Sequence, residues 1–185
     1  MLNDQLSAFM LPLDFCCSVL SNQTLFSNVY SLKIHISPNE LSDENIGIGF
    51  QKIKAIVDNC LSNGIITNQD NELASGFSSL DNSIITLPDE PFDFFLGSIL
   101  LAKFIKITER YFDIDCLSIA SAAGQQVQYN VYDPYDCGLE LDGDFWWNRD
   151  DMSADYTKPV PWDELSLEEP QPFTPHVVKG GLSEN

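Results

Sequence analysis

The stretch YSLKIHI, residues 30–36, alternates apolar and polar side chains along its whole length. Tyr30, Leu32, Ile34 and Ile36 occupy every second position. Successive side chains of a strand point to opposite faces, so this period of two predicts a half-buried β-strand. A strand with one apolar face needs a second layer to cover it, and the neighbouring sequence has to supply that layer.

Two helical segments follow this strand and are suited to cover it. In residues 42–64 apolar side chains recur at spacings of four and three, with Ser42 placed to cap the start and Gly64 the end. The second segment, Phe92–Arg110, begins just after Pro91 and is apolar on almost every side. Such an all-round apolar helix is typical of the centre of a core.

Three further short runs have the composition of strands. They are Ser83–Leu87, Cys116–Ala120 and Val127–Tyr132, and the last two are expected to form a hairpin around Gly124. The predicted order of elements is therefore β-α-β-α-β-β. We predict an α+β fold in which a small mixed sheet is covered by two helices.

The patterns divide the chain into three parts. Residues 1–28 show no clean period, and Pro12 interrupts any helix there, so we expect an N-terminal segment with at most a short helix after Pro12. Residues 29–149 hold the α+β domain, which we expect to end on a late hairpin with an Asp-Gly turn at Asp142. Residues 150–185 are acidic, contain five prolines and show no period, which indicates an extended tail.

The charge balance limits the partners that the protein can bind. Asp and Glu number 28 against 9 Lys and Arg, a net charge of −19, and residues 111–170 alone hold 14 acids and 2 bases. Nucleic-acid phosphates and anionic lipids are bound through basic clusters, so we expect neither direct nucleic-acid binding nor membrane binding. A surface of this sign attracts basic protein surfaces and cations.

The cysteines and the start of the chain predict a cytoplasmic protein. The five cysteines are odd in number and show no paired spacing, as expected for thiols in a reducing compartment. Asp4 and Asp14 lie where a signal peptide would carry positive charge. The longest apolar run, within residues 92–107, is too short and too charged to span a bilayer.

Motifs for catalysis and for cofactors are weak. Nucleophilic catalysis usually needs a base such as histidine, and the two histidines, His35 and His176, lie in the predicted strand and in the tail. Gly47 and Gly49 form a GxG pair, but neither a Walker lysine nor a GxGxxG pattern follows. We therefore expect a non-catalytic protein without a cofactor.

The carboxylates of residues 136–151 leave one enzymatic alternative open. Hard cations such as Mg²⁺ and Ca²⁺ take several oxygen ligands, and this stretch is rich in them. The spacing does not match an EF-hand, and a solvated acidic face explains the same residues. A metal-dependent enzyme that uses these carboxylates is therefore kept as an alternative, with no metal site assigned.

The stretch DGDFWWNRDD, residues 142–151, combines acids with three adjacent aromatic residues. Aromatic anchors surrounded by charge are typical of interaction hot spots, and carboxylates steer a basic partner. If the stretch is a strand, Trp146 and Trp147 point to opposite faces, so one of them is expected to be an exposed anchor. The predicted partner-binding residues are Asp142, Asp144, Phe145, Trp146, Trp147, Asp150, Asp151 and Trp162.

These observations predict a non-catalytic acidic protein that binds a basic surface of a protein partner. A more specific version is an inhibitor encoded by a virus or mobile element, in which carboxylates mimic nucleic-acid phosphates on a protein that binds nucleic acid. The other alternative is a structural subunit of a larger assembly, with the apolar helix at residues 92–110 as its contact face. The sequence does not predict the oligomeric state.

Overall fold

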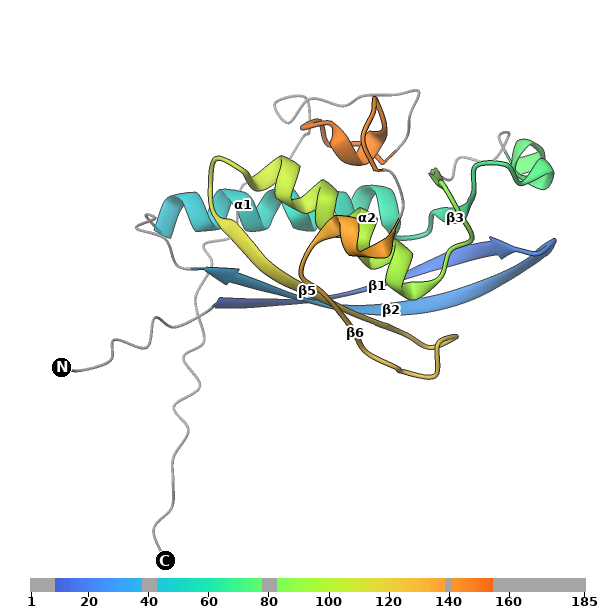
Figure 1. Ribbon diagram of the computed structural model, residues 1–185, viewed down its shortest axis with the longest axis horizontal. Coiled ribbons are helices and arrows are strands. Elements are labelled where there is room, and N and C mark those ends of the chain that lie inside the picture. The colour runs from blue at the N-terminus through green and yellow to red at the C-terminus, as the bar shows by residue number, and fades with distance from the viewer. Residues whose placement is uncertain (1–8, 38–42, 78–82, 139–140, 155–185) are drawn as a thin grey trace, which may run out of the picture.

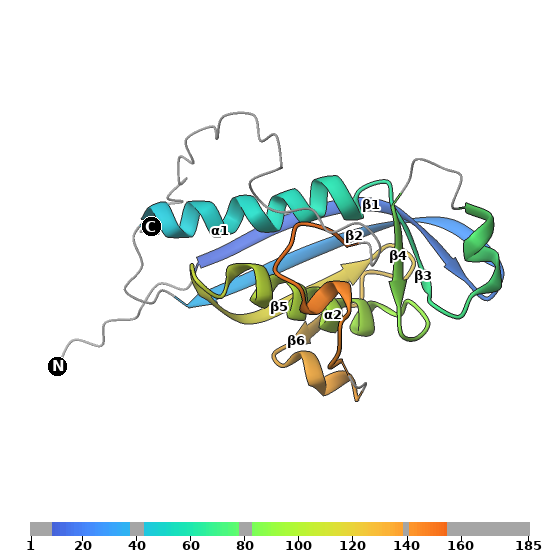
Figure 2. The ribbon, with the colours of Figure 1, turned by 90° about the horizontal axis from the view of Figure 1, so that it is seen from above.

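The computed structural model describes residues 9–37, 43–77, 83–138 and 141–154 of the 185-residue chain. In these parts a single six-stranded sheet carries two long helices, α1 and α2, on one face (Figures 1 and 2). The predicted mixed α+β class is confirmed. The order of strands and long helices is β-β-α-β-β-α-β-β and contains two strands, β1 and β3, that the sequence did not predict.

Strands β1 (Phe9–Ser21) and β2 (Thr24–Ser37) form a long antiparallel hairpin with no shift of register along its length. Its two-residue turn is made by Asn22 and Gln23, with φ values of 46° and 65°. These left-handed values are those of a type I′ turn, which matches the twist of the flanking strands. The expectation of a mixed segment with a short helix after Pro12 is therefore wrong, because Pro12 lies within β1.

The hairpin forms the centre of the sheet, whose strand order is β4-β3-β1-β2-β5-β6. On one side β3 (Ile65–Asn68) and β4 (Ile84–Leu87) run parallel to β1. On the other side β5 (Asp113–Ser121) and β6 (Tyr129–Val131) continue the antiparallel ladder from β2. Strands β4 and β6 are consequently the two edges of the sheet.

The helices pack on the apolar side of these strands. Helix α1 (Asp43–Ile56) continues into a π-helical turn, Val57–Leu61, and α2 (Asp93–Thr108) crosses the sheet near β5. The contact of α2 with the sheet is close: a Cβ added at Gly97 would lie 2.8 Å from a methyl carbon of Ile119. Among the described residues no helix is long and apolar enough to cross a membrane.

The parts that the sequence described as irregular contain more structure than expected. A 3-10 helix, Glu72–Phe77, lies within the predicted connection between the first helix and the strand at Ile84. At the other end of the chain, a 3-10 helix at Trp146–Asn148 replaces the predicted late hairpin, which is wrong. Met152 and Ala154 are each 2% exposed, so packed structure extends past the expected boundary at residue 149. The extended tail was predicted for residues 150–185, and its residues from 155 onwards lie outside the described residues.

The burial of the Cys17 thiol allows a prediction about the stability of the fold at alkaline pH. Burial, with a smaller contribution from Cys16, raises the pKa of this thiol from 9.0 to about 12. The folded state therefore keeps a proton that the unfolded chain loses, so this contribution to stability is complete below pH 9 and is lost as the pH rises towards 12. We expect Cys17→Ala to flatten the fall in the free energy of unfolding across this window, by up to about 1.4 kcal/mol per pH unit.

Denaturant titrations at a series of pH values would measure this slope. Cys16→Ala is the matched control because Cys16 neighbours Cys17 but is exposed. A Cys17→Ala slope equal to that of the wild type would show that the buried thiol does not control alkaline unfolding.

Candidate protein-interaction surface

The stretch that the sequence singled out, residues 142–151, folds against α2 on the side away from the sheet (Figure 1). Trp146 and Trp147 are 1% and 2% exposed. The Trp146 indole N–H donates to the carbonyl oxygen of Thr86 in β4 at 3.0 Å, and the Trp147 indole N–H donates to that of Leu141 at 3.0 Å. Both rings are therefore part of the packed core.

The expectation that one of these two tryptophans is an exposed anchor is wrong. It assumed a strand, in which adjacent side chains point in opposite directions. In the 3-10 helix at Trp146–Asn148, successive side chains are only about a third of a turn apart. Trp147 stacks on Phe145, with ring centroids 4.5 Å apart, and Trp146 meets the edge of Trp147, so the rings cover one another.

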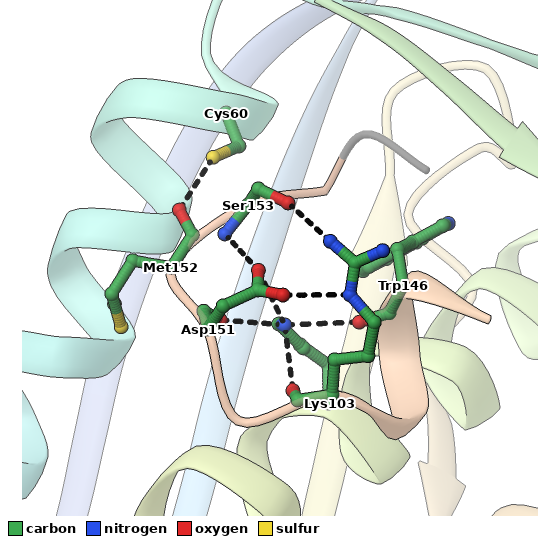
Figure 3. Close-up of polar contacts among 7 residues, drawn as sticks. Cys60, Lys103, Trp146, Asp151, Met152 and Ser153 are labelled. Atoms are coloured by element: carbon green, nitrogen blue, oxygen red, sulfur yellow. Dashed lines mark hydrogen bonds and ion pairs between the residues drawn. The ribbon is translucent and has the colours of Figure 1, made fainter. Parts of the chain in front are cut away.

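A fully buried lysine from α2 holds this segment in place. The Lys103 side chain has no exposed surface, and its Nζ donates to the carbonyl oxygens of Trp146, Arg149 and Asp151 at 2.9, 2.9 and 2.7 Å (Figure 3). An ammonium group has three protons, and three carbonyls of one loop accept them. Lys103 thus connects the middle of α2 to a loop more than 40 residues further along the chain.

The ammonium group of Lys103 also has a carboxylate, that of Asp151, close enough to balance its charge. Burial lowers the pKa of this amine to about 8, while Asp151, whose Oδ1 lies 3.9 Å from Nζ, opposes the shift. For Asp151 burial acts to raise the pKa, but hydrogen bonds from Arg149 and Ser153 outweigh it, so the pKa of this carboxyl is lowered. The Arg149 Nε–Asp151 Oδ2 distance is 2.6 Å. We infer that Arg149 and Asp151 are fixed by each other and by Lys103.

The structure divides the predicted partner-binding residues into two groups. Asp142, Asp144 and Asp150 are exposed. The other predicted residues of the segment are less accessible, since Phe145 and Asp151 are only partly exposed and both tryptophans are buried. Trp162 lies outside the described residues.

The exposed aromatic residues that lie just before this segment in the sequence are tyrosines. Tyr129, Tyr132 and Tyr135 are 40%, 67% and 54% exposed, on β6 and on the 3-10 helix Pro134–Cys137 that follows it. Tyr132 and Tyr135 lie outside residues 142–151 and are not among the partner-binding residues that the sequence predicted.

One of these tyrosines is hydrogen-bonded to an exposed acid. The Tyr135 hydroxyl donates to Asp142 Oδ1 at 2.8 Å, which connects the loop after β6 to residues 141–144. This hydrogen bond, with the negative charge of Asp142, raises the pKa of Tyr135. The Asp133 side chain accepts from the backbone N–H of Tyr135 and caps the 3-10 helix. We call the following residues the acidic tyrosine surface: Tyr129, Tyr132, Asp133, Tyr135, Asp136, Asp142 and Asp144.

Two observations from the described part of the chain concern the alternatives derived from the sequence. No group of three or more His, Cys, Asp or Glu side chains there is arranged to hold a metal ion. The contact face expected on the apolar second helix is largely covered, because ten residues of α2 are buried. In comparisons with protein-family models and with curated proteins, no match to this chain was found.

Proposed function

We propose that the protein is a non-catalytic interaction protein that binds a basic surface of another protein through the acidic tyrosine surface. The observation that carries the proposal is the exposure of three tyrosines beside four carboxylates on neighbouring segments of the fold. Tyrosine supplies a large contact area and a hydroxyl at little conformational cost, which makes it common in interfaces.

The sign of the charge selects the partner. Residues 129–148 contain five acids and no Lys, Arg or His. Carboxylates on this surface therefore have no basic neighbour in the same stretch to neutralise them, and they attract lysine and arginine side chains of a partner. Such complementarity raises the rate of association and falls with added salt.

A finer form of the proposal is that the partner's basic surface normally binds nucleic acid. Asp136 and Asp144 then occupy positions that backbone phosphates would take, and an acidic protein competes with DNA or RNA for one site. Support for this form comes from the net charge alone. A purified partner whose DNA binding is unaffected by saturating amounts of this protein would contradict it, without affecting the broader proposal.

The test compares two pairs of substitutions that remove equal charge. Asp136→Asn with Asp144→Asn neutralises the acidic tyrosine surface, and Asp70→Asn with Glu72→Gln neutralises two exposed acids near the 3-10 helix at residues 72–77. We expect the first pair to weaken capture of a basic partner from cell lysate several-fold at low salt. The second pair is expected to leave capture close to that of the wild type.

Capture is measured by affinity pull-down at low and high salt, with circular dichroism to confirm folding. Tyr132→Ser adds a test of contact area. Tyr132 is the most exposed of the three tyrosines, so its replacement should weaken capture at both salt concentrations. Equal losses from the two acid pairs would mean that only total charge matters. If no variant weakened capture, the acidic tyrosine surface would not take part in the interaction.

A further inference from the structure

Near the turn of the β1–β2 hairpin, β2 extends beyond its neighbour β5, and the side of β2 away from β1 is unpaired there. Pairing of β2 with β5 stops at Tyr30, and beyond it the Val29 carbonyl accepts from the Ala122 backbone N–H. In the described part of the chain, no strand pairs with Thr24–Ser27 on the side away from β1, whereas the next residue, Asn28, accepts at its Oδ1 from the Ala123 backbone N–H. Figures 1 and 2 show that this end of the hairpin reaches past β5 and β6.

The backbone groups on this edge point outward at known positions. Backbone N–H and C=O groups alternate in direction along an antiparallel strand. The Val29 carbonyl points away from β1, so those of Ser27 and Leu25 point the same way. Two of the side chains there are apolar and accessible, with Leu25 46% and Phe26 37% exposed.

The edge lacks the devices by which proteins usually block strand pairing. Such edges normally carry charged residues, proline or a bulge. From Phe15 to Leu32 the chain has no charged residue, no histidine and no proline, although the protein as a whole has 20% charged residues. The β1–β2 register has no bulge. An uncovered edge of this kind is a template for another strand.

We propose that this edge pairs with the same edge of a second copy of the chain, antiparallel and across a two-fold axis at Phe26. The pairing places Leu25 of one copy opposite Ser27 of the other, and the outward N–H and C=O groups of both residues then form hydrogen bonds. Phe26 lies opposite its own copy in a pair without hydrogen bonds, where side chains approach most closely.

The absence of charge on this edge and the symmetry of strand pairing favour a second copy as the occupant. Each copy carries a net charge of −19, so two copies repel one another over most of their surface and associate most readily where charge is absent. A basic partner gains no electrostatic attraction from an uncharged edge. A two-fold arrangement lets a single edge be its own complement, as in other isologous dimers.

The test is the mass of the full chain in solution at increasing protein concentration, by light scattering or sedimentation. We expect the mass to rise from that of one chain towards that of two. Ser27→Pro removes an N–H that points away from β1, so it spares the hairpin and removes one hydrogen bond to the second copy. Phe26→Lys places two like charges against each other at the axis. Both variants are expected to remain monomeric.

Ile105→Lys is the matched control, because Ile105 on α2 is 38% exposed, about as much as Phe26. This variant should dimerise like the wild type. A wild type that stays monomeric overturns the proposal, whether or not it captures another protein through this edge. Dimerisation that persists in both Ser27→Pro and Phe26→Lys also overturns it. Circular dichroism on each variant separates a loss of pairing from a loss of folding.

Discussion

Replacing Lys103 with methionine is expected to lower the free energy of unfolding by about 3 kcal/mol. The substitution keeps an unbranched side chain of similar length but removes the three donors that the carbonyls of Trp146, Arg149 and Asp151 accept. Each buried carbonyl left without a donor costs about 1–3 kcal/mol. Part of this cost is offset, because methionine does not bear the desolvation penalty of a buried ammonium.

The loss should be localised as well as large. Lys103 contacts the loop at residues 146–151, so Lys103→Met should raise amide hydrogen exchange in that loop while the exchange of β1 and β2 changes less. Acrylamide should also quench tryptophan fluorescence more strongly, because Trp146 and Trp147 are buried only while the loop is closed. Denaturant titration gives the free energy, and exchange gives the location.

Lys106→Met is the matched control for this experiment. Lys106 lies on the same helix, but its side chain is 41% exposed and its ion pair with Glu109 lies on the surface. Surface pairs contribute about 0–1 kcal/mol, so little change is expected. If Lys103→Met were as stable as Lys106→Met, with unchanged exchange at residues 146–151, the three carbonyl contacts would not hold the segment.

The sequence predicted the elements whose period is local and clear. The alternation at residues 30–36 and the four-and-three spacing after Ser42 correspond to β2 and α1, and the apolar run after Pro91 corresponds to α2. One face of β2 packs on the core, whereas α2 is covered both by the sheet and by the 3-10 helix at Trp146–Asn148, so the spacing of apolar residues follows the burial of each element.

Strand β1 was missed although its pattern was present. Leu13, Phe15, Cys17 and Val19 occupy alternate positions, but Cys16 beside Cys17 and Leu20 beside Val19 interrupt the alternation of apolar and polar residues. The type I′ turn gave no signal either, since it is made by Asn22 and Gln23 without the usual glycine.

The error at residues 142–151 has a different cause. Composition alone does not tell whether an aromatic residue beside acids is an anchor for a partner or for the protein's own core. That distinction depends on Lys103, which lies more than 40 residues earlier and reads locally as a solvated lysine on an apolar helix. A buried charge that meets a distant loop leaves no periodic signal, so only the folded structure reveals it.

Trp146→Ala is expected to lower the free energy of unfolding by about 3–5 kcal/mol, the range for removing a buried tryptophan. The ring is 1% exposed, packs at 82° against Trp147 and donates to the Thr86 carbonyl on the edge strand β4. The substitution therefore opens a cavity and also leaves a carbonyl on that edge without its donor.

Trp146→Phe separates the two contributions and also separates stability from binding. Phenylalanine retains most of the packing but has no indole N–H, so we expect a loss of about 1 kcal/mol, the net value of one hydrogen bond. Because this variant stays folded, its capture of a basic partner should equal that of the wild type, since Trp146 is buried and the acidic tyrosine surface is unchanged. A stable Trp146→Phe protein that no longer captures the partner would instead mean that the indole contacts the partner directly. The Trp146 ring would then have to become exposed on binding.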